Sequence, residues 1–367
     1  MRSRLLKNFL LGLMGAVVIA VAISLFTAVT ATTGLSYTVT GLGTLGDYPI
    51  TLPLRINDLG QVIGWSRTNS SPPLGRAFLW QNGKMTNLGT LGGSSSRAFD
   101  INNSGQVVGS SLTSSGVYHA FMWQNGKMTD LGTHGSDNSG FAVGINNSGQ
   151  VVGWSYQASS NKPDLLNESY HAVSWQNSGI TDLGTLSGDN FSRAFNINNK
   201  GQIFGESYKF PNNSTPRTQR IFRWQNGATT NLGNLVTPSG YTDSYINGIN
   251  NKGQVVGASS GFSGSSYKSA AYVWQNGTLT NLGSLGGTIS EAIDINTVGT
   301  VVGYSFTSSG TNHAFVWRNG KMRDLNNFLL PGSGWELTAA TGINNKGQIV
   351  GAGKFSGQPK AFLLTPV

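Results

Sequence analysis

The chain has 367 residues, of which 11% are charged and 38% hydrophobic, with 51 glycines and no cysteine. This charged fraction is well below the quarter or so found in average soluble domains, and the many Gly, Ser, Thr and Asn residues favour a turn-rich, all-β fold. The lack of cysteine excludes disulfides, zinc–thiolate sites, iron–sulfur clusters and thiol nucleophiles. The net charge of +9 contains no Lys/Arg run, which argues against a nucleic-acid partner.

The N-terminal segment has the layout of a secretory signal. A short basic stretch, Met1–Lys7, precedes a continuously apolar or small run from Phe9 to Phe26. We expect residues 1–31 to be a signal peptide cleaved after Ala31, followed by a linker over 32–36. The apolar run could also span a bilayer as a retained anchor. In both cases the rest of the chain is expected outside the cytoplasm, secreted or at the cell surface, with no membrane association apart from this leader.

The rest of the chain is built from seven copies of one repeat, numbered here units one to seven. The motif Ile-Asn-x-x-Gly-x-Val/Ile-x-Gly begins at Ile56, Ile101, Ile145, Ile197, Ile249, Ile295 and Ile343. An Ala-Phe-x-Trp motif or a close variant follows in each unit, and in units one to six an Asn-Gly or similar turn and a short Thr-rich stretch come next. Internal repeats of this length indicate a repeat architecture.

Each unit is predicted to contain four strands. The first ends at Ile-Asn, and Asn-x-x-Gly supplies a turn to the second strand through an Asx side chain and a glycine of positive φ. The third strand carries Ala-Phe-x-Trp, and the Asn-Gly after it predicts a type I′ hairpin to the fourth. Four short strands with a recurring Trp at a period near 45 residues are typical of propeller blades.

The two ends of the repeat region complement each other. Unit seven stops after its third strand, at Val367, whereas Tyr37–Gly46 resembles a fourth strand that has no third strand before it. We therefore predict that residues 37–367 form an all-β, seven-bladed β-propeller of four-stranded antiparallel blades, closed by an N-terminal strand that completes the last blade. An open β-array is the alternative.

The recurrent motifs resemble a known bacterial repeat. Ile-Asn-Asn-x-Gly-Gln-Val-Val-Gly, His-Ala-Phe-x-Trp and Asp-Leu-Gly-Thr-Leu-Gly-Gly are similar to the HAF-type extracellular repeat, whose His-Ala-Phe occurs here at His119–Phe121 and His313–Phe315. The resemblance covers essentially everything after the leader. It implies a secreted or surface-exposed β-propeller-like protein and no particular enzymatic activity.

Few residues suggest chemistry, and we expect no catalytic residues, no metal ligands and no cofactor. Asp100 and Asp294 precede Ile-Asn in units two and six, where they would either make local hydrogen bonds or face a central channel. Three histidines open third strands, and because equivalent positions on different blades lie far apart, a metal site is not expected. They are His119, His171 and His313. His134 stands in a turn and is given no role.

The irregular parts of the repeat are the connections between second and third strands, which are long at Trp154–Tyr170 and Ser207–Arg220. Loops that vary on a regular scaffold are where binding sites are usually built. Four aromatic side chains in or near these connections are the candidate ligand-binding residues, either stacking on sugar rings or packing against a neighbouring blade. They are Trp65, Trp154, Tyr156 and Tyr304.

These observations lead us to expect a monomeric, non-enzymatic binding scaffold with a glycan or cell-surface protein as its partner. One alternative is a hydrolase or lyase acting on polysaccharides or esters, which needs two acids, or an acid with Arg or Tyr, to converge. Its candidate acids are Asp100, Glu206, Glu291 and Asp294. A second alternative is a purely structural envelope or matrix protein.

Overall fold

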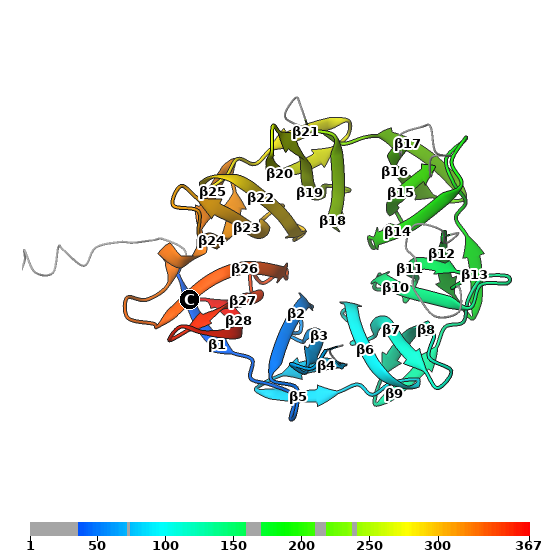
Figure 1. Cartoon of the computed structure of the whole chain (residues 1–367), viewed down its shortest axis with the longest axis horizontal. Helices are drawn as coiled ribbons and strands as arrows, with labels where there is room; N and C mark the ends of the chain where they lie inside the picture. Colours follow the sequence, from blue (N-terminus) through cyan, green and yellow to red (C-terminus); the bar gives the residue numbers. More distant parts are fainter. Residues whose placement is uncertain (1–35, 72–73, 159–169, 210–217, 237–240) are drawn as a thin grey trace, which may run out of the picture. The chain divides into compact units, whose positions relative to one another are not determined.

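Figure 1 shows the computed structural model of the protein, which describes residues 36–71, 74–158, 170–209, 218–236 and 241–367. These residues form β-strands joined by turns, with one short 3-10 turn, η1 (Leu325–Phe328). In this part of the chain no helix has the length and apolar character needed to cross a bilayer. The predicted signal peptide with its cleavage site after Ala31, most of the linker, and most of both long connections lie outside the described residues.

Units one to four each form a four-stranded antiparallel sheet whose strands pair in chain order. Unit one contains β2 (Ile50–Ile56), β3 (Val62–Arg67), β4 (Gly75–Gln81) and β5 (Lys84–Asn87). Unit two contains β6 (Gly92–Ile101), β7 (Val107–Thr113), β8 (Tyr118–Gln124) and β9 (Lys127–Asp130). Unit three contains β10 (Ser139–Ile145), β11 (Val151–Tyr156), β12 (Tyr170–Gln176) and β13 (Gly179–Asp182). Unit four contains β14 (Phe191–Ile197), β15 (Ile203–Lys209), β16 (Thr218–Gln225) and β17 (Ala228–Gly233).

Units five and six repeat this pattern but share one eight-stranded sheet, because β20 and β22 meet in parallel at Ser269 and Ile289. Unit five contains β18 (Asp243–Ile249), β19 (Val255–Ser263), β20 (Ser266–Gln275) and β21 (Thr278–Asn281). Unit six contains β22 (Gly286–Ile295), β23 (Val301–Thr307), β24 (Asn312–Arg318) and β25 (Lys321–Asp324). The prediction of four-stranded antiparallel units is confirmed by these sheets.

The last sheet joins the two ends of the repeat region. It contains β26 (Trp335–Ile343), β27 (Ile349–Phe355), β28 (Gln358–Pro366) and, as its fourth strand, β1 (Tyr37–Gly41). The antiparallel register of β1 and β28 runs from Tyr37 opposite Pro366 to Gly41 opposite Phe362. The segment at the start of the repeat region that resembles a fourth strand therefore lies beside the third strand of unit seven.

The turns follow the predicted chemistry. Between the third and fourth strands of unit one, Asn82 and Gly83 have φ of 50° and 81°, the positive values that a type I′ turn requires. Between the first and second strands, the side-chain oxygen of Asn57 accepts the backbone N–H groups of Leu59 and Gln61, both at 3.0 Å. Such an Asx turn replaces the backbone partners that are lost where a strand ends.

The asparagine of each Ile-Asn also links its unit to the next one. Its side-chain amide donates to the backbone carbonyl of the equivalent asparagine in the following unit, at 2.9 to 3.4 Å. The series runs Asn57, Asn102, Asn146, Asn198, Asn250, Asn296 and Asn344, and Asn344 donates to Asn57. Figure 1 shows the strands that carry these residues as the innermost strand of each unit, around a common centre.

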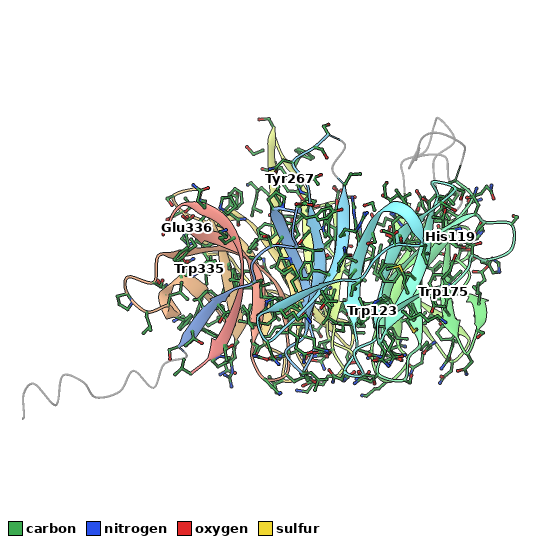
Figure 2. All side chains as sticks on the ribbon, turned by 90° about the horizontal axis from the view of Figure 1, so that it is seen from below. His119, Trp123, Trp175, Tyr267, Trp335 and Glu336 are labelled. Atoms are coloured by element: carbon green, nitrogen blue, oxygen red, sulfur yellow. The ribbon has the colours of Figure 1, made fainter. Side chains whose placement is uncertain are left out.

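Neighbouring sheets pack against each other through apolar side chains. One cluster combines Ile63 and Ala77 of unit one with Ile101 and Phe121 of unit two, all at most 7% exposed. The recurring tryptophans contribute to this packing. Trp80, Trp175 and Trp274 are buried, whereas Trp123, Trp224 and Trp317 are half-buried against the same clusters. Figure 2 shows Trp123 and Trp175 beside their strands, with His119 nearer the edge at which Tyr267 projects.

Candidate functional site

The innermost strand of every unit contains a β-bulge at the same place. Its register against the second strand shifts two residues before the isoleucine of Ile-Asn. The recurring glycine of the second strand makes room for this bulge, because a Cβ on Gly153 would lie 1.8 Å from the carbonyl oxygen of Phe141. Bulges re-aim side chains and carbonyls next to functional sites.

The residue between the bulge and the isoleucine forms a set that we call the axial ring. Its members are Arg55, Asp100, Gly144, Asn196, Gly248, Asp294 and Gly342. Close packing favours glycine at the third, fifth and seventh positions. For example, a Cβ on Gly248 would lie 3.1 Å from the Cα of Asp294. The axial ring therefore concentrates one cation and two acids where the innermost strands approach each other.

Arg55 reaches across this ring and is held by backbone carbonyls of three units. Its Nη1 donates to the oxygens of Leu54 at 3.2 Å and Thr341 at 3.0 Å, and its Nη2 donates to the oxygen of Asn247 at 2.9 Å. All three acceptors are bulged residues, so the bulges turn their carbonyls toward the guanidinium. The guanidinium is thus held in place by neutral carbonyl groups. Its positive charge can therefore still interact with the nearby carboxylates.

Asp100 and Asp294 occupy equivalent positions and make equivalent contacts. One oxygen of Asp100 accepts the N–H of Ile101 and the other accepts the N–H of Ile145 in the next unit, both at 2.9 Å. Asp294 binds the N–H groups of Ile295 and Ile343 in the same way, again at 2.9 Å. Each carboxylate therefore joins two sheets. Of the two alternatives for these acids, local hydrogen bonding or a place facing a central channel, the structure shows the hydrogen bonding.

Both carboxyl groups are harder to ionise than a free aspartate. Burial, together with a smaller effect of the Asp294 charge, raises the pKa of Asp100 to about 6 against the opposing effects of Arg55 and the two backbone N–H groups. Burial likewise raises the pKa of Asp294, again opposed by Arg55. Raised carboxyl pKa values are a property that acid–base catalytic residues commonly have.

A pocket of about 350 Å³ adjoins the axial ring between units four and five. It is lined by Arg193, Phe195, Glu206, Gln219, Ile221, Tyr245, Ile246 and Asn247. It reaches the axial ring through Asn247, whose backbone carbonyl accepts the hydrogen bond from Arg55. A pocket of this size, with aromatic walls and a few fixed polar groups, suits a small ring-shaped ligand.

The polar groups of this pocket are tightly held. Glu206 is 4% exposed and accepts hydrogen bonds from the guanidinium of Arg193, at 3.0 Å from Nε, and from the amide of Gln219. The Arg193 guanidinium also lies 5.7 Å from the ring centre of Trp154 and 5.8 Å from that of Phe195. This arrangement keeps Glu206 fixed in orientation at the pocket wall.

The four predicted ligand-binding aromatics lie in three different units. The ring of Trp65 is half-buried beneath Arg97, whose guanidinium carbon is 4.3 Å from the ring centre. Trp154 stacks on Phe141 at 5.3 Å, and Tyr156 is 5% exposed beside Tyr170.

Tyr304 is half-buried and hydrogen-bonded to Glu291, and its burial and that acid raise the pKa of the phenol. Of the predicted set, the structure brings only Trp154 and Tyr156 together, on β11.

Two of the predicted strand-edge histidines pair within their own units. His119 Nδ1 lies 2.7 Å from Asp130, and His313 Nδ1 lies 2.6 Å from Asp324. Each carboxylate belongs to the neighbouring fourth strand or its end. His171 makes a different contact, with Asp137 in the connection that precedes its unit.

No family model matches the chain, and no curated protein matches it. Among solved structures, acylaminoacyl peptidase of Pyrococcus horikoshii is 10% identical with a TM-score of 0.56, over 92% of this chain and 53% of that one. The β-propeller domain of the Trilobed protease from Pyrococcus furiosus is 10% identical with a TM-score of 0.54, over 91% of this chain and 94% of that one. The chain has a β-propeller fold.

A third similar structure is a puromycin-hydrolyzing peptidase of Mycobacterium tuberculosis, 11% identical with a TM-score of 0.51, over 90% of this chain and 53% of that one. The chain thus spans about half the length of the two whole peptidases. These neighbours contradict the prediction of a non-enzymatic binding scaffold, because the propellers that this one resembles belong to hydrolytic enzymes. The expectation of a chain without catalytic function is corrected accordingly, and what the likeness itself shows for this chain is the fold.

Arg55, and the approach of the two acids to it, were not predicted from the sequence. Arg55, Asp100 and Asp294 come from three units and share no local motif. Aligning the seven units at the residue before Ile-Asn would have added Arg55 to the two acids, because in this column four units carry a charged or polar residue and three carry glycine.

Proposed function

We propose that this protein is a glycan hydrolase whose acid–base pair is Asp100 and Asp294 of the axial ring. The observation that carries the proposal is the pair of carboxyl groups with raised pKa values around one fixed guanidinium. Glycoside hydrolysis uses two carboxyl groups, one to protonate the leaving oxygen and one to assist the attack on the sugar carbon. A carboxyl with a pKa of about 6 keeps its proton at higher pH than a free aspartate does, which suits it to the first of these roles.

In this mechanism Asp100 donates its proton to the leaving oxygen, and Asp294 acts as the base or nucleophile. Arg55 favours the ionised form of both acids, whereas burial favours the protonated form of both. The pocket beside Asn247 supplies a place for a sugar ring next to the axial ring. There Phe195 and Tyr245 offer stacking faces, while Glu206 and Gln219 offer hydrogen bonds to hydroxyl groups.

We infer that the scaffold for this site is a closed ring of seven blades. Supporting this are the β1–β28 pairing and the asparagine series that returns from Asn344 to Asn57. Further support comes from Asn345 of unit seven, whose backbone N–H and side-chain amide donate to the carboxylate of Asp58 in unit one at 2.8 and 2.9 Å. Closure would fix the distances between axial residues that come from different units.

We further propose that the protein acts outside the cytoplasm, as expected from its leader and its resemblance to the HAF-type repeat. A glycan of the cell surface or surroundings is then the substrate. The absence of cysteine is compatible with an oxidising compartment.

The test is hydrolysis of a panel of aryl glycosides and soluble polysaccharides by the purified protein, followed as release of aryl alcohol or reducing ends. We expect turnover on at least one substrate class, and a loss of about 100-fold or more in kcat for D100N. The control is D130N, which removes an exposed acid of β9. Wild-type protein with no activity above buffer, or a folded D100N variant with full activity, would overturn the proposal.

A further inference from the structure

Two of the four histidines of the chain meet at one carboxylate in unit three. His134 and Asp137 belong to the connection between β9 and β10, and His171 lies at the start of β12. One ligand atom from each of these three side chains lies within 4.8 Å of the other two. The cluster stands apart from the axial ring and contains none of its residues.

The carboxylate at the centre of the cluster is held in place. The side chain of Asp137 is 4% exposed, and its Oδ2 lies 3.0 Å from Nδ1 of His171. The buried hydroxyl of Ser155 donates to the same oxygen and accepts the backbone N–H of His134 at 3.2 Å. Ser155 thus orients two of the three residues, as the hydrogen-bond partners of metal ligands do.

The next unit shows what these positions hold in an ordinary blade. The residues equivalent to His134, Asp137 and His171 are Leu186, Asp189 and Arg220. There the leucine is 7% exposed in the core, and the arginine Nη2 forms an ion pair with Asp189 at 2.8 Å.

The leucine recurs in most of the other connections. The place of His134 is taken by Leu45, Leu91, Leu186, Leu235 and Leu285. Unit three therefore replaces an apolar residue and a permanent cation by two imidazoles around a retained carboxylate.

We propose that His134, Asp137 and His171 bind a divalent transition-metal ion of the zinc class. Two imidazoles and one carboxylate are a ligand set that zinc uses in catalytic sites, where a water takes the fourth position. Tetrahedral bond lengths place ligand atoms about 3.3 Å apart. The 3.0 Å separation of His171 Nδ1 and Asp137 Oδ2 is close to that value, so a metal ion can replace the proton shared by these two atoms.

The remaining ligand is also within reach. The imidazole rings of His134 and His171 lie 5.8 Å apart at 61°, so their nitrogens can turn toward a common point. The His171 side chain is 36% exposed and has room to rotate. Metal binding releases the protons that these groups carry and ties the β9–β10 connection to β12.

The test is equilibrium dialysis of the purified full-length chain, freed of metal by a chelator, against ZnCl2. We expect one zinc ion per chain, and at least about 10-fold weaker binding in H134L and in H171R. Both substitutions install the residue that unit four carries at the same place, so the fold has a precedent for each. Cobalt(II) gives a second readout, since its visible absorption reports tetrahedral coordination.

Two further variants sharpen the result. S155A retains all three ligands and is expected to weaken zinc binding by about 10-fold. H313Q alters a histidine paired with Asp324 in unit six and should leave zinc binding unchanged. Wild-type protein that binds no more zinc than the H134L/H171R double variant would overturn the proposal. This outcome is independent of glycan hydrolysis, because the readout is bound metal.

Discussion

At the scale of single residues, the electrostatics of the axial ring depend on Arg55. Its guanidinium donates only to backbone carbonyls, so its charge is not neutralised by a direct ion pair in the contacts that hold it. It acts on Asp100 and Asp294 through space and lowers the pKa of both, while burial raises them. The position of this one side chain therefore offsets part of the effect of burial on the pKa of both acids.

Replacing Arg55 by methionine should raise the pKa of Asp100 from about 6 by about one pH unit. Methionine keeps much of the length of the side chain and removes the positive charge that favours the ionised carboxylate. The pKa can be measured by ¹³C NMR of labelled aspartate carboxyl carbons. R97M, which removes the cation over Trp65, serves as the control and should leave Asp100 unchanged. A folded R55M variant with an unchanged or lower Asp100 pKa would contradict this account.

Individual site residues could be predicted from the sequence only where they differ from the other units at a position next to a recurring motif. Asp100 and Asp294 were identified because they precede Ile-Asn. Arg55 was not, because its convergence with them depends on carbonyls of Asn247 and Thr341, which bulges turn toward the axis. His134 was overlooked for a similar reason, since its partner His171 is 37 residues away on another element.

At the scale of elements, β1 has a role that its five residues do not suggest. It is the fourth strand of a sheet whose other three strands are β26, β27 and β28. Tyr37 at its start and Leu42 directly after its end are each 3% exposed. Burial raises the pKa of the Tyr37 phenol to about 12, which agrees with its packed position. The strand thus adds both a hydrogen-bonded edge and buried apolar surface to unit seven.

Deleting Tyr37–Gly46 should destabilise the whole propeller, with a melting temperature lower by roughly 10 °C. The comparison is a variant that shortens the hairpin tip around Phe262, a side chain 70% exposed, and that should lose little. Thermal unfolding followed by circular dichroism measures both. Equal melting temperatures for the two deletions would refute the closing role of β1.

Strands and turns were the most predictable elements. Their determinants are local, because Asn-Gly demands positive φ and Asn-x-x-Gly forms an Asx turn whatever the rest of the chain does. The bulges were not predicted. In the sequence they are marked only by a glycine on the opposing strand, such as Gly153. The reason for this glycine is the nearby carbonyl of Phe141, which leaves no room for a Cβ and whose position is known only from the structure.

At the scale of the whole molecule, the repeat explains the architecture but not the activity. A regular scaffold places equivalent residues around one axis, so a site arises from the few columns in which the units differ. Here those columns contribute Arg55, Asp100 and Asp294, which lie 45 to 239 residues apart along the chain. The similar peptidase propellers contradict the expectation of a binding scaffold, and no local motif marks a site of the kind proposed here.

The measurement that tests the central claim most directly is the pH dependence of kcat/KM on whichever glycan substrate the protein hydrolyses. If Asp100 is the general acid, it must be protonated, so kcat/KM should fall as the pH rises above about 6. In R55M this alkaline limb should move to higher pH, because the positive charge that lowers the pKa of Asp100 is gone. An alkaline limb that stays at the same pH in R55M, or that persists in D100N, would contradict the assignment of the axial acids.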